Sequence, residues 1–334
     1  MSLSRQRPRA RAGTVFAALA LVGAAAVAAG RDPPLREVGR MELPGIGGRI
    51  DHLAIDLEGR RLFVAALGAD EVEVVDIQAG RRVGRLTGVR EPQGVAYLPS
   101  LHRLIVAGGE SGDVVAFEGD KRVGAATGLP DADNVRFFAP TGRVVVGYGH
   151  ALAVVDPVTL AVVERIALPG HPEAFELAEH GPQIYVNVPE AGRIVVVDRR
   201  TGRTVAAWPV APEAANFPMA LDEAAHRLYV GTRRPARLLV YDTAAVRVLS
   251  RTALCGDADD LFLDTERSRL IALCGEGEVD VFSTRGAPGD EPPRRIASAP
   301  GARTGLYVSA TGTLFVAEPA RDGAPARIQV YRAD

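Results

Sequence analysis

Short apolar runs separated by polar turns recur along almost the whole chain. Within residues 171–208 such runs lie at 175–178, 184–188, 194–197 and 204–208, and the turns between them contain Gly, Pro and charged residues. Runs of about five residues rich in Val, Ile and Tyr, bounded by such turns, predict β-strands joined by hairpins. No window after residue 30 has the spacing of an amphipathic helix. We therefore expect residues 171–208 to form one four-stranded antiparallel sheet.

The same unit occurs seven times, with 40 to 44 residues between equivalent positions. The apolar core of the second strand begins in turn at Leu62, Leu104, Val144, Ile184, Leu228, Leu270 and Leu314. One such sheet cannot bury both of its faces alone, so neighbouring copies must cover them. Strand repeats of this length predict an all-β fold, a seven-bladed β-propeller of four-stranded antiparallel blades.

The two ends of the chain are predicted to share the last blade. The seventh copy has three strands, near 305–309, 313–317 and 327–332, and the chain then ends. An additional strand at 35–43 precedes the first copy and resembles the fourth strands of other copies. We predict that it completes blade 7, so that residues 31–334 form one closed propeller without exposed inter-blade faces.

Residues 1–30 have the pattern of a signal peptide. Arg5, Arg7, Arg9 and Arg11 precede an Ala-rich apolar stretch at 14–29, which small residues follow. A retained membrane anchor is the alternative, although the stretch is shorter than the ~20 residues of a typical span. We expect cleavage, a periplasmic or secreted protein, and no stable membrane span afterwards.

Composition narrows the possible partners and leaves the cysteines open. The formal net charge is −2, and no basic run follows residue 12, so we expect no nucleic-acid binding. A closed ring is expected to be a monomer. Cys255 and Cys274 flank the predicted second strand of blade 6. They form either a disulfide, as an oxidising compartment allows, or two buried thiols.

Polar residues stand in register at one end of the predicted ring. Eleven residues before each second-strand core the chain has Asp51, Gln93, Asp133, Glu173, Phe217, Asp259 and Arg303. The next positions hold His52, Gly94, Asn134, Ala174, Pro218, Asp260 and Thr304. Hairpin turns do not require such a register, so we expect these side chains to converge on the central channel. The asparagines of the chain, Asn134, Asn187 and Asn216, map to the same end.

These positions give twelve candidate ligand-binding residues: Asp51, His52, Gln93, Asn134, His171, Glu173, Asn187, Asn216, Arg233, Asp259, Asp260 and Arg303. Crowded carboxylates raise one another's pKa unless cations intervene, and Arg49 and Arg234 are further internal partners. Arg136 and Glu176, at equivalent positions of adjacent blades, are predicted to form a structural salt bridge. The channel end would hold a small polar ligand, a divalent cation on oxygen ligands or the tail of a protein partner, or be lined only by water.

Several segments resemble the YncE-like, YVTN-repeat family of exported bacterial β-propellers. They are DADNVRF at 131–137, GHPEAFEL at 170–177, residues 216–242, GDADDLFLD at 256–264 and APGARTGLYV at 299–308. The chain has YVNV at 185–188 in place of the YVTN for which the family is named. The resemblance implies a seven-bladed propeller in the periplasm and carries no catalytic residues to this chain.

Two functions are expected from this pattern. The first is a periplasmic propeller that binds a small polar ligand, a cation or a protein partner at the polar end of its channel. The alternative is a lactonase-, hydrolase- or lyase-type enzyme at the same end, with a possible divalent cation and with His52 or Glu173 as general base.

Overall fold

The computed structural model describes residues 1–2, 34–289 and 291–333. The predicted signal peptide therefore lies almost wholly outside the described residues. The chain divides into two units, Met1–Asp32 and Pro33–Asp334, and the second contains all the sheets. Within the described part, no helix has the length and apolar character needed to cross a bilayer.

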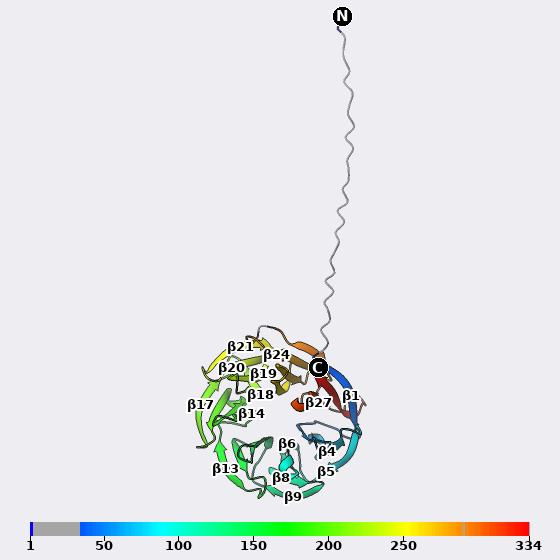
Figure 1. Cartoon of the computed structure of the whole chain (residues 1–334), viewed down its shortest axis with the longest axis vertical. Helices are drawn as coiled ribbons and strands as arrows, with labels where there is room; N and C mark the ends of the chain where they lie inside the picture. Colours follow the sequence, from blue (N-terminus) through cyan, green and yellow to red (C-terminus); the bar gives the residue numbers. More distant parts are fainter. Residues whose placement is uncertain (3–33, 290, 334) are drawn as a thin grey trace. The chain divides into compact units, whose positions relative to one another are not determined.

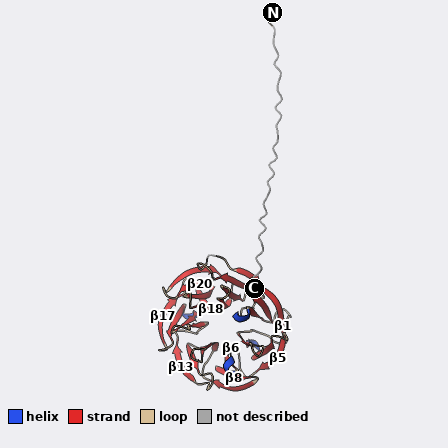
Figure 2. Cartoon of the chain, viewed as in Figure 1, coloured by secondary structure: helices blue, strands red, loops and turns tan. Residues whose placement is uncertain are grey.

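Seven four-stranded antiparallel sheets lie around a common centre (Figures 1 and 2). Blades 1 to 3 contain β2 (Leu53–Asp56), β3 (Arg61–Ala66), β4 (Glu71–Asp76) and β5 (Arg81–Leu86); β6 (Pro92–Leu98), β7 (Arg103–Gly108), β8 (Asp113–Glu118) and β9 (Lys121–Ala126); and β10 (Ala132–Phe138), β11 (Arg143–Tyr148), β12 (Ala151–Val155) and β13 (Val162–Ala167).

Blades 4 to 6 contain β14 (Phe175–Leu177), β15 (Gln183–Val188), β16 (Arg193–Asp198) and β17 (Arg203–Pro209); β18 (Ala214–Asp222), β19 (Arg227–Arg234), β20 (Ala236–Asp242) and β21 (Arg247–Ala253); and β22 (Ala258–Asp264), β23 (Arg269–Cys274), β24 (Glu278–Ser283) and β25 (Arg294–Ala297). Four 3-10 turns complete the described elements: η1 (Leu67–Ala69), η2 (Pro99–Leu101), η3 (Pro189–Ala191) and η4 (Ser309–Thr311). The predicted all-β, seven-bladed propeller is confirmed.

Blade 7 is closed by the N-terminal strand, as predicted. It consists of β26 (Gly305–Val308), β27 (Thr313–Glu318), β28 (Ala326–Ala333) and β1 (Leu35–Leu43), in the spatial order β1-β28-β27-β26. The first and last residues of β1 are 2% and 0% exposed. The closing strand therefore contributes side chains to the core as well as backbone hydrogen bonds.

Apolar side chains from adjacent blades pack together between the sheets. In one cluster, Phe63 of blade 1 packs with Val106 of blade 2. In another, Trp208 is 6% exposed and lies 5.5 Å from the ring of Tyr185 and 5.9 Å from that of Tyr241 in the next blade. The prediction that Trp208 belongs to the core is confirmed. Such packing between blades fixes the width of the central channel.

The innermost strands carry an irregularity where they enter the sheets. On β10, Ala132 pairs with Tyr148 and Val135 with Val146, so this strand has one more residue than its partner between the two pairs. β6, β18 and β22 show the same one-residue β-bulge at equivalent places. A bulge turns local side chains away from the regular alternation. This bulge gives the residues in register their common direction.

A disulfide joins Cys255 to Cys274 beside this end of the ring. The Cα atoms are 5.8 Å apart, within the range that a disulfide requires. The bond ties the segment before β22 to the end of β23. It resolves the two alternatives left open by the sequence.

Candidate functional site

Three adjoining cavities follow the channel from the end at which the inner strands begin. The outer one, which we call the mouth, has a volume of about 550 Å³. A gap of about 20 Å³ follows, and then an inner cavity of about 400 Å³. Asp259 lines all three. The mouth is lined by side chains that include Arg49, Gln93, Asp131, Asp133, His171, Glu173, Phe217, Arg233, Arg234 and Arg303.

One side of the mouth is a closed cluster of two arginines and two aspartates. Arg303 lies 2.9 Å from Asp257 and 3.0 Å from Asp259, measured between nitrogen and carboxylate oxygen. Arg233 lies 3.3 Å from Asp257 and also pairs with Asp259. Its guanidinium stacks 3.7 Å from the centre of the Phe217 ring. The four charges balance, and the stacking holds one guanidinium in place.

The other side of the mouth is centred on a histidine between aspartates. The Nδ1 atom of His171 lies 3.0 Å from the carbonyl oxygen of Gly149 and 3.1 Å from Asp131. Its Nε2 atom lies 3.8 Å from Asp133. Burial opposes protonation of this ring, but the two carboxylates outweigh it and raise the pKa of His171 to about 9. The imidazole is therefore a cation at neutral pH.

A second histidine lies deeper, between two buried aspartates. His52 is 3.7 Å from Asp51 through Nε2 and 3.5 Å from Asp260 through Nδ1. Asp51 is 1% exposed and also meets Arg49 at 2.9 Å. Burial raises the pKa of Asp51 to about 6 and raises that of Asp260 as well. The backbone N–H of Gly305 donates to Asp260 at 2.8 Å, which fixes that carboxylate across two blades.

Glu173 is the carboxylate of the site whose pKa lies near neutrality. Burial raises the pKa of Glu173 to about 7, repulsion from Asp133 and Asp259 adds to the rise, and His171 and Arg233 oppose it. The group lines both the mouth and the gap. Near pH 7 it can therefore accept or release a proton.

The structure brings ten of the twelve predicted residues to the channel and places two elsewhere. The mouth, gap and inner cavity are lined by Asp51, His52, Gln93, Asn134, His171, Glu173, Arg233, Asp259, Asp260 and Arg303. Asn187 and Asn216 are 0% exposed. The Nδ2 atom of Asn216 donates to Oδ1 of Asn187 at 2.8 Å, and Asn187 donates to the carbonyl of Phe217 at 2.9 Å. These two amides join blades 4 and 5 and do not line a cavity.

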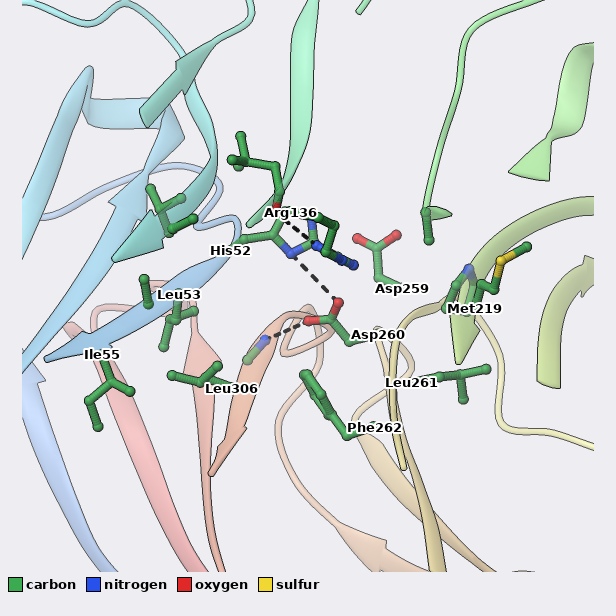
Figure 3. A pocket seen from close by; sticks show the side chains of 18 of the residues that line it. His52, Leu53, Ile55, Arg136, Met219, Asp259, Asp260, Leu261, Phe262 and Leu306 are labelled. Atoms are coloured by element: carbon green, nitrogen blue, oxygen red, sulfur yellow. Dashed lines mark hydrogen bonds and ion pairs between the residues drawn. The ribbon is translucent and has the colours of Figure 1, made fainter. Parts of the chain in front are cut away.

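Sequence reasoning did not assign the inner cavity. Figure 3 shows His52, Arg136, Asp259 and Asp260 at one end of it, with Ile55, Leu306 and Phe262 toward the other. Such a concave space, with apolar side chains toward one end and a few convergent polar groups at the other, is typical of a small-molecule site. The clue available in the sequence was the alternation along the inner strands, which places residues 53, 55, 262 and 306 beyond the polar set.

The predicted salt bridge between Arg136 and Glu176 is not formed. Both side chains line the inner cavity, but among the described residues no ion pair within 4.0 Å joins them. Burial raises the pKa of Glu176, and the charge of Arg136 offsets part of that rise. The Nη1 atom of Arg136 donates to the carbonyl of Val135 at 3.2 Å. The two side chains thus line the same cavity from adjacent blades without direct contact.

The predicted divalent cation finds no preformed cluster of side chains. Within the part of the chain that the structure describes, no group of three or more His, Cys, Asp or Glu residues is arranged to hold a metal ion. Instead, Asp51 pairs with Arg49 and His52, Asp260 with His52, and Asp133 with His171.

Comparison with known proteins identifies the fold and no family. No protein-family model and no curated protein matches the chain. Among solved structures, hydrazine synthase from Kuenenia stuttgartiensis is similar, with a TM-score of 0.75 and 14% sequence identity. The match covers 87% of this chain and 99% of that one. Similarity at this level of identity supports a seven-bladed β-propeller and carries no function to this chain.

Proposed function

We propose that this propeller binds a small polar ligand at the polar end of its central channel. The observation that carries the proposal is the sequence of mouth, gap and inner cavity, lined by ionisable side chains from several blades. Buried groups with shifted pKa values, such as Asp51, His171 and Glu173, concentrate at functional sites. Their crowding lowers stability unless an occupant compensates, and a purely structural channel would gain nothing from it.

We also propose that the protein is an exported, monomeric member of the YncE-like group. The signal-peptide pattern of residues 1–30 supports export. The disulfide between Cys255 and Cys274 supports an oxidising compartment such as the periplasm. A protein partner that inserts a charged tail into the mouth would use the same site, with the tail as a larger ligand.

Thermal melting of the full-length protein tests the binding proposal. The panel contains phosphate, acetate, glycine, propylamine and glucose, each added singly. A ligand at 100 times its dissociation constant stabilises the native state by about 2.7 kcal/mol, which a melt resolves. We expect at least one compound to raise Tm in the wild type and in the exposed control Arg36→Gln, but not in Asp259→Asn. A panel without any shift, or a shift unchanged in Asp259→Asn, contradicts the proposal.

One observation favours an enzyme as the second candidate. Glu173 lines the mouth with a pKa of about 7, which suits a general base at neutral pH. A lactone or ester in the mouth would then be attacked by a water that Glu173 activates. We expect turnover from a panel of such esters to be lost in Glu173→Gln and kept in Glu42→Gln, which changes an exposed carboxylate outside the channel. No turnover above that of Glu173→Gln excludes this candidate.

A further inference from the structure

The gap holds three buried oxygen atoms without hydrogen-bond donors. They are Oδ1 of Asp51, Oδ1 of Asp133 and Oδ1 of Asn134. The three residues are 1%, 8% and 4% exposed and all line the gap. A buried acceptor that lacks a donor costs free energy, and native proteins rarely leave one unpaired. Three such acceptors on residues around one small space favour an occupant that donates several hydrogen bonds.

The charges around the gap favour a cation as this occupant. Five carboxylates line it, and two arginines of the mouth already neutralise Asp259. The other four are Asp51, Asp133, Glu173 and Asp260. Against them stand Arg49 and His52 in the lining, His171 from the mouth and Arg136 from the inner cavity, where Glu176 adds a fifth carboxylate. With these five carboxylates ionised and both histidines protonated, one carboxylate remains without a counterion.

The shapes of the neighbouring spaces decide what kind of cation fits. The gap, at about 20 Å³, has room for one small group such as a water or an ammonium. It shares His52, Ala174, Asp259 and Asp260 with the inner cavity. That cavity, of about 400 Å³, is lined farther along by Ile55, Phe262 and Leu306 (Figure 3). A ligand with its charged group in the gap can therefore extend an apolar part into the inner cavity.

We propose that the gap is an ammonium-binding subsite and that the ligand is a primary amine whose alkyl part occupies the inner cavity. A primary ammonium has three N–H donors, one for each acceptor of Asp51, Asp133 and Asn134. Its charge supplies the missing counterion. This inference rests on the proposed ligand-binding function and names the class of ligand.

Calorimetric titration of the full-length protein with hexylamine tests the inference at neutral pH. Hexanol, hexanoate and hexyltrimethylammonium are the matched probes, because they lack the charge, reverse it or lack the N–H donors. We expect hexylamine to bind at least tenfold more tightly than any of them. Propylamine should bind more weakly than hexylamine, because it buries fewer methylene groups. Affinity for hexylamine that does not exceed that of hexanol overturns the inference.

Variants and other ions separate the remaining outcomes. Asp133→Asn should weaken hexylamine binding at least tenfold, whereas Glu42→Gln, which changes an exposed carboxylate outside the channel, should change it less than twofold. Competition of hexylamine by Ca²⁺ or Zn²⁺ at lower concentration would identify a metal site and overturn the inference. If hexanoate, phosphate or glycine binds and hexylamine does not, the inference of an amine ligand is overturned and the proposed ligand-binding function is retained. Failure of every probe would overturn both.

Discussion

Replacing Glu173 by glutamine should stabilise the ligand-free protein while it weakens ligand binding. The carboxyl faces the charges of Asp133, His171, Asp259 and Arg233. Its pKa of about 7 in the folded state compares with an ordinary value of 4.5. Because the folded-state pKa is raised, ionisation of Glu173 destabilises the fold, and the neutral amide of glutamine removes that penalty.

The size and the pH dependence of this gain in the free energy of unfolding follow from the raised pKa of Glu173. The rise of the pKa from 4.5 to about 7 corresponds to roughly 3 kcal/mol, at about 1.4 kcal/mol for each pH unit. Since the side chain is partly exposed, screening reduces this to about 1–2 kcal/mol. Below pH 4.5 the carboxyl is protonated in both states, so the penalty is absent. It develops between pH 4.5 and 7 and is complete above pH 7.

Melting curves of wild type and Glu173→Gln at pH 4 and pH 8 test this reasoning. We expect equal Tm values at pH 4 and a Tm higher by about 2–4 °C for the variant at pH 8. Glu42→Gln, which changes an exposed carboxylate of the closing strand, is the matched control and should shift Tm by less than about 1 °C at either pH. A variant that is less stable than wild type at pH 8, or equally shifted at both pH values, refutes the interpretation of crowded carboxylates.

Three further variants test the framework of the ring. Leu43→Ala in the closing strand removes a fully buried side chain and should lower the free energy of unfolding by about 2–5 kcal/mol, whereas the exposed Val38→Ala should lower it by less than about 1 kcal/mol in the same urea titration. Equal effects of the two would contradict a closure that depends on core packing. The double variant Cys255→Ser, Cys274→Ser opens a loop with a sequence separation of 19 residues and should lose about 3 kcal/mol; an unchanged urea midpoint would show that the bond does not form. Asn216→Ala leaves the buried Oδ1 of Asn187, in the adjacent blade, without its donor. We therefore expect the free energy of unfolding to fall by about 1–3 kcal/mol, with hexylamine affinity unchanged within twofold. Lost affinity at intact stability would return Asn216 to the binding site.

The repeat in the sequence was sufficient to predict the fold, because successive side chains of a β-strand point to opposite faces of its sheet. Apolar side chains at the same positions of seven copies must all face neighbouring blades, and the missing fourth strand had one available partner, residues 35–43. The polar register was also informative. Asp133 and its counterparts in three other blades lie at a bulge, which turns their side chains from the regular alternation.

The rest depended on distances that the sequence does not contain. Asn187 and Asn216 have the same residue type and lie at the same end as Asn134, yet their amides turn toward the adjacent blade. Arg136 and Glu176 occupy equivalent positions of adjacent blades, but the Arg136 guanidinium donates to the carbonyl of Val135 and lies over the Phe175 ring instead. The inner cavity likewise results from the circumference of the ring, which seven packed interfaces set together.

A crystal structure of the protein soaked with 6-bromohexylamine tests the central claim most directly, because the bromine can be located by anomalous scattering. We predict a bromine position in the inner cavity beside Phe262, with the ammonium within hydrogen-bond distance of Asp51, Asp133 and Asn134. Bromine on the outer surface of the ring, or an empty channel at a saturating concentration of the amine, would contradict the account.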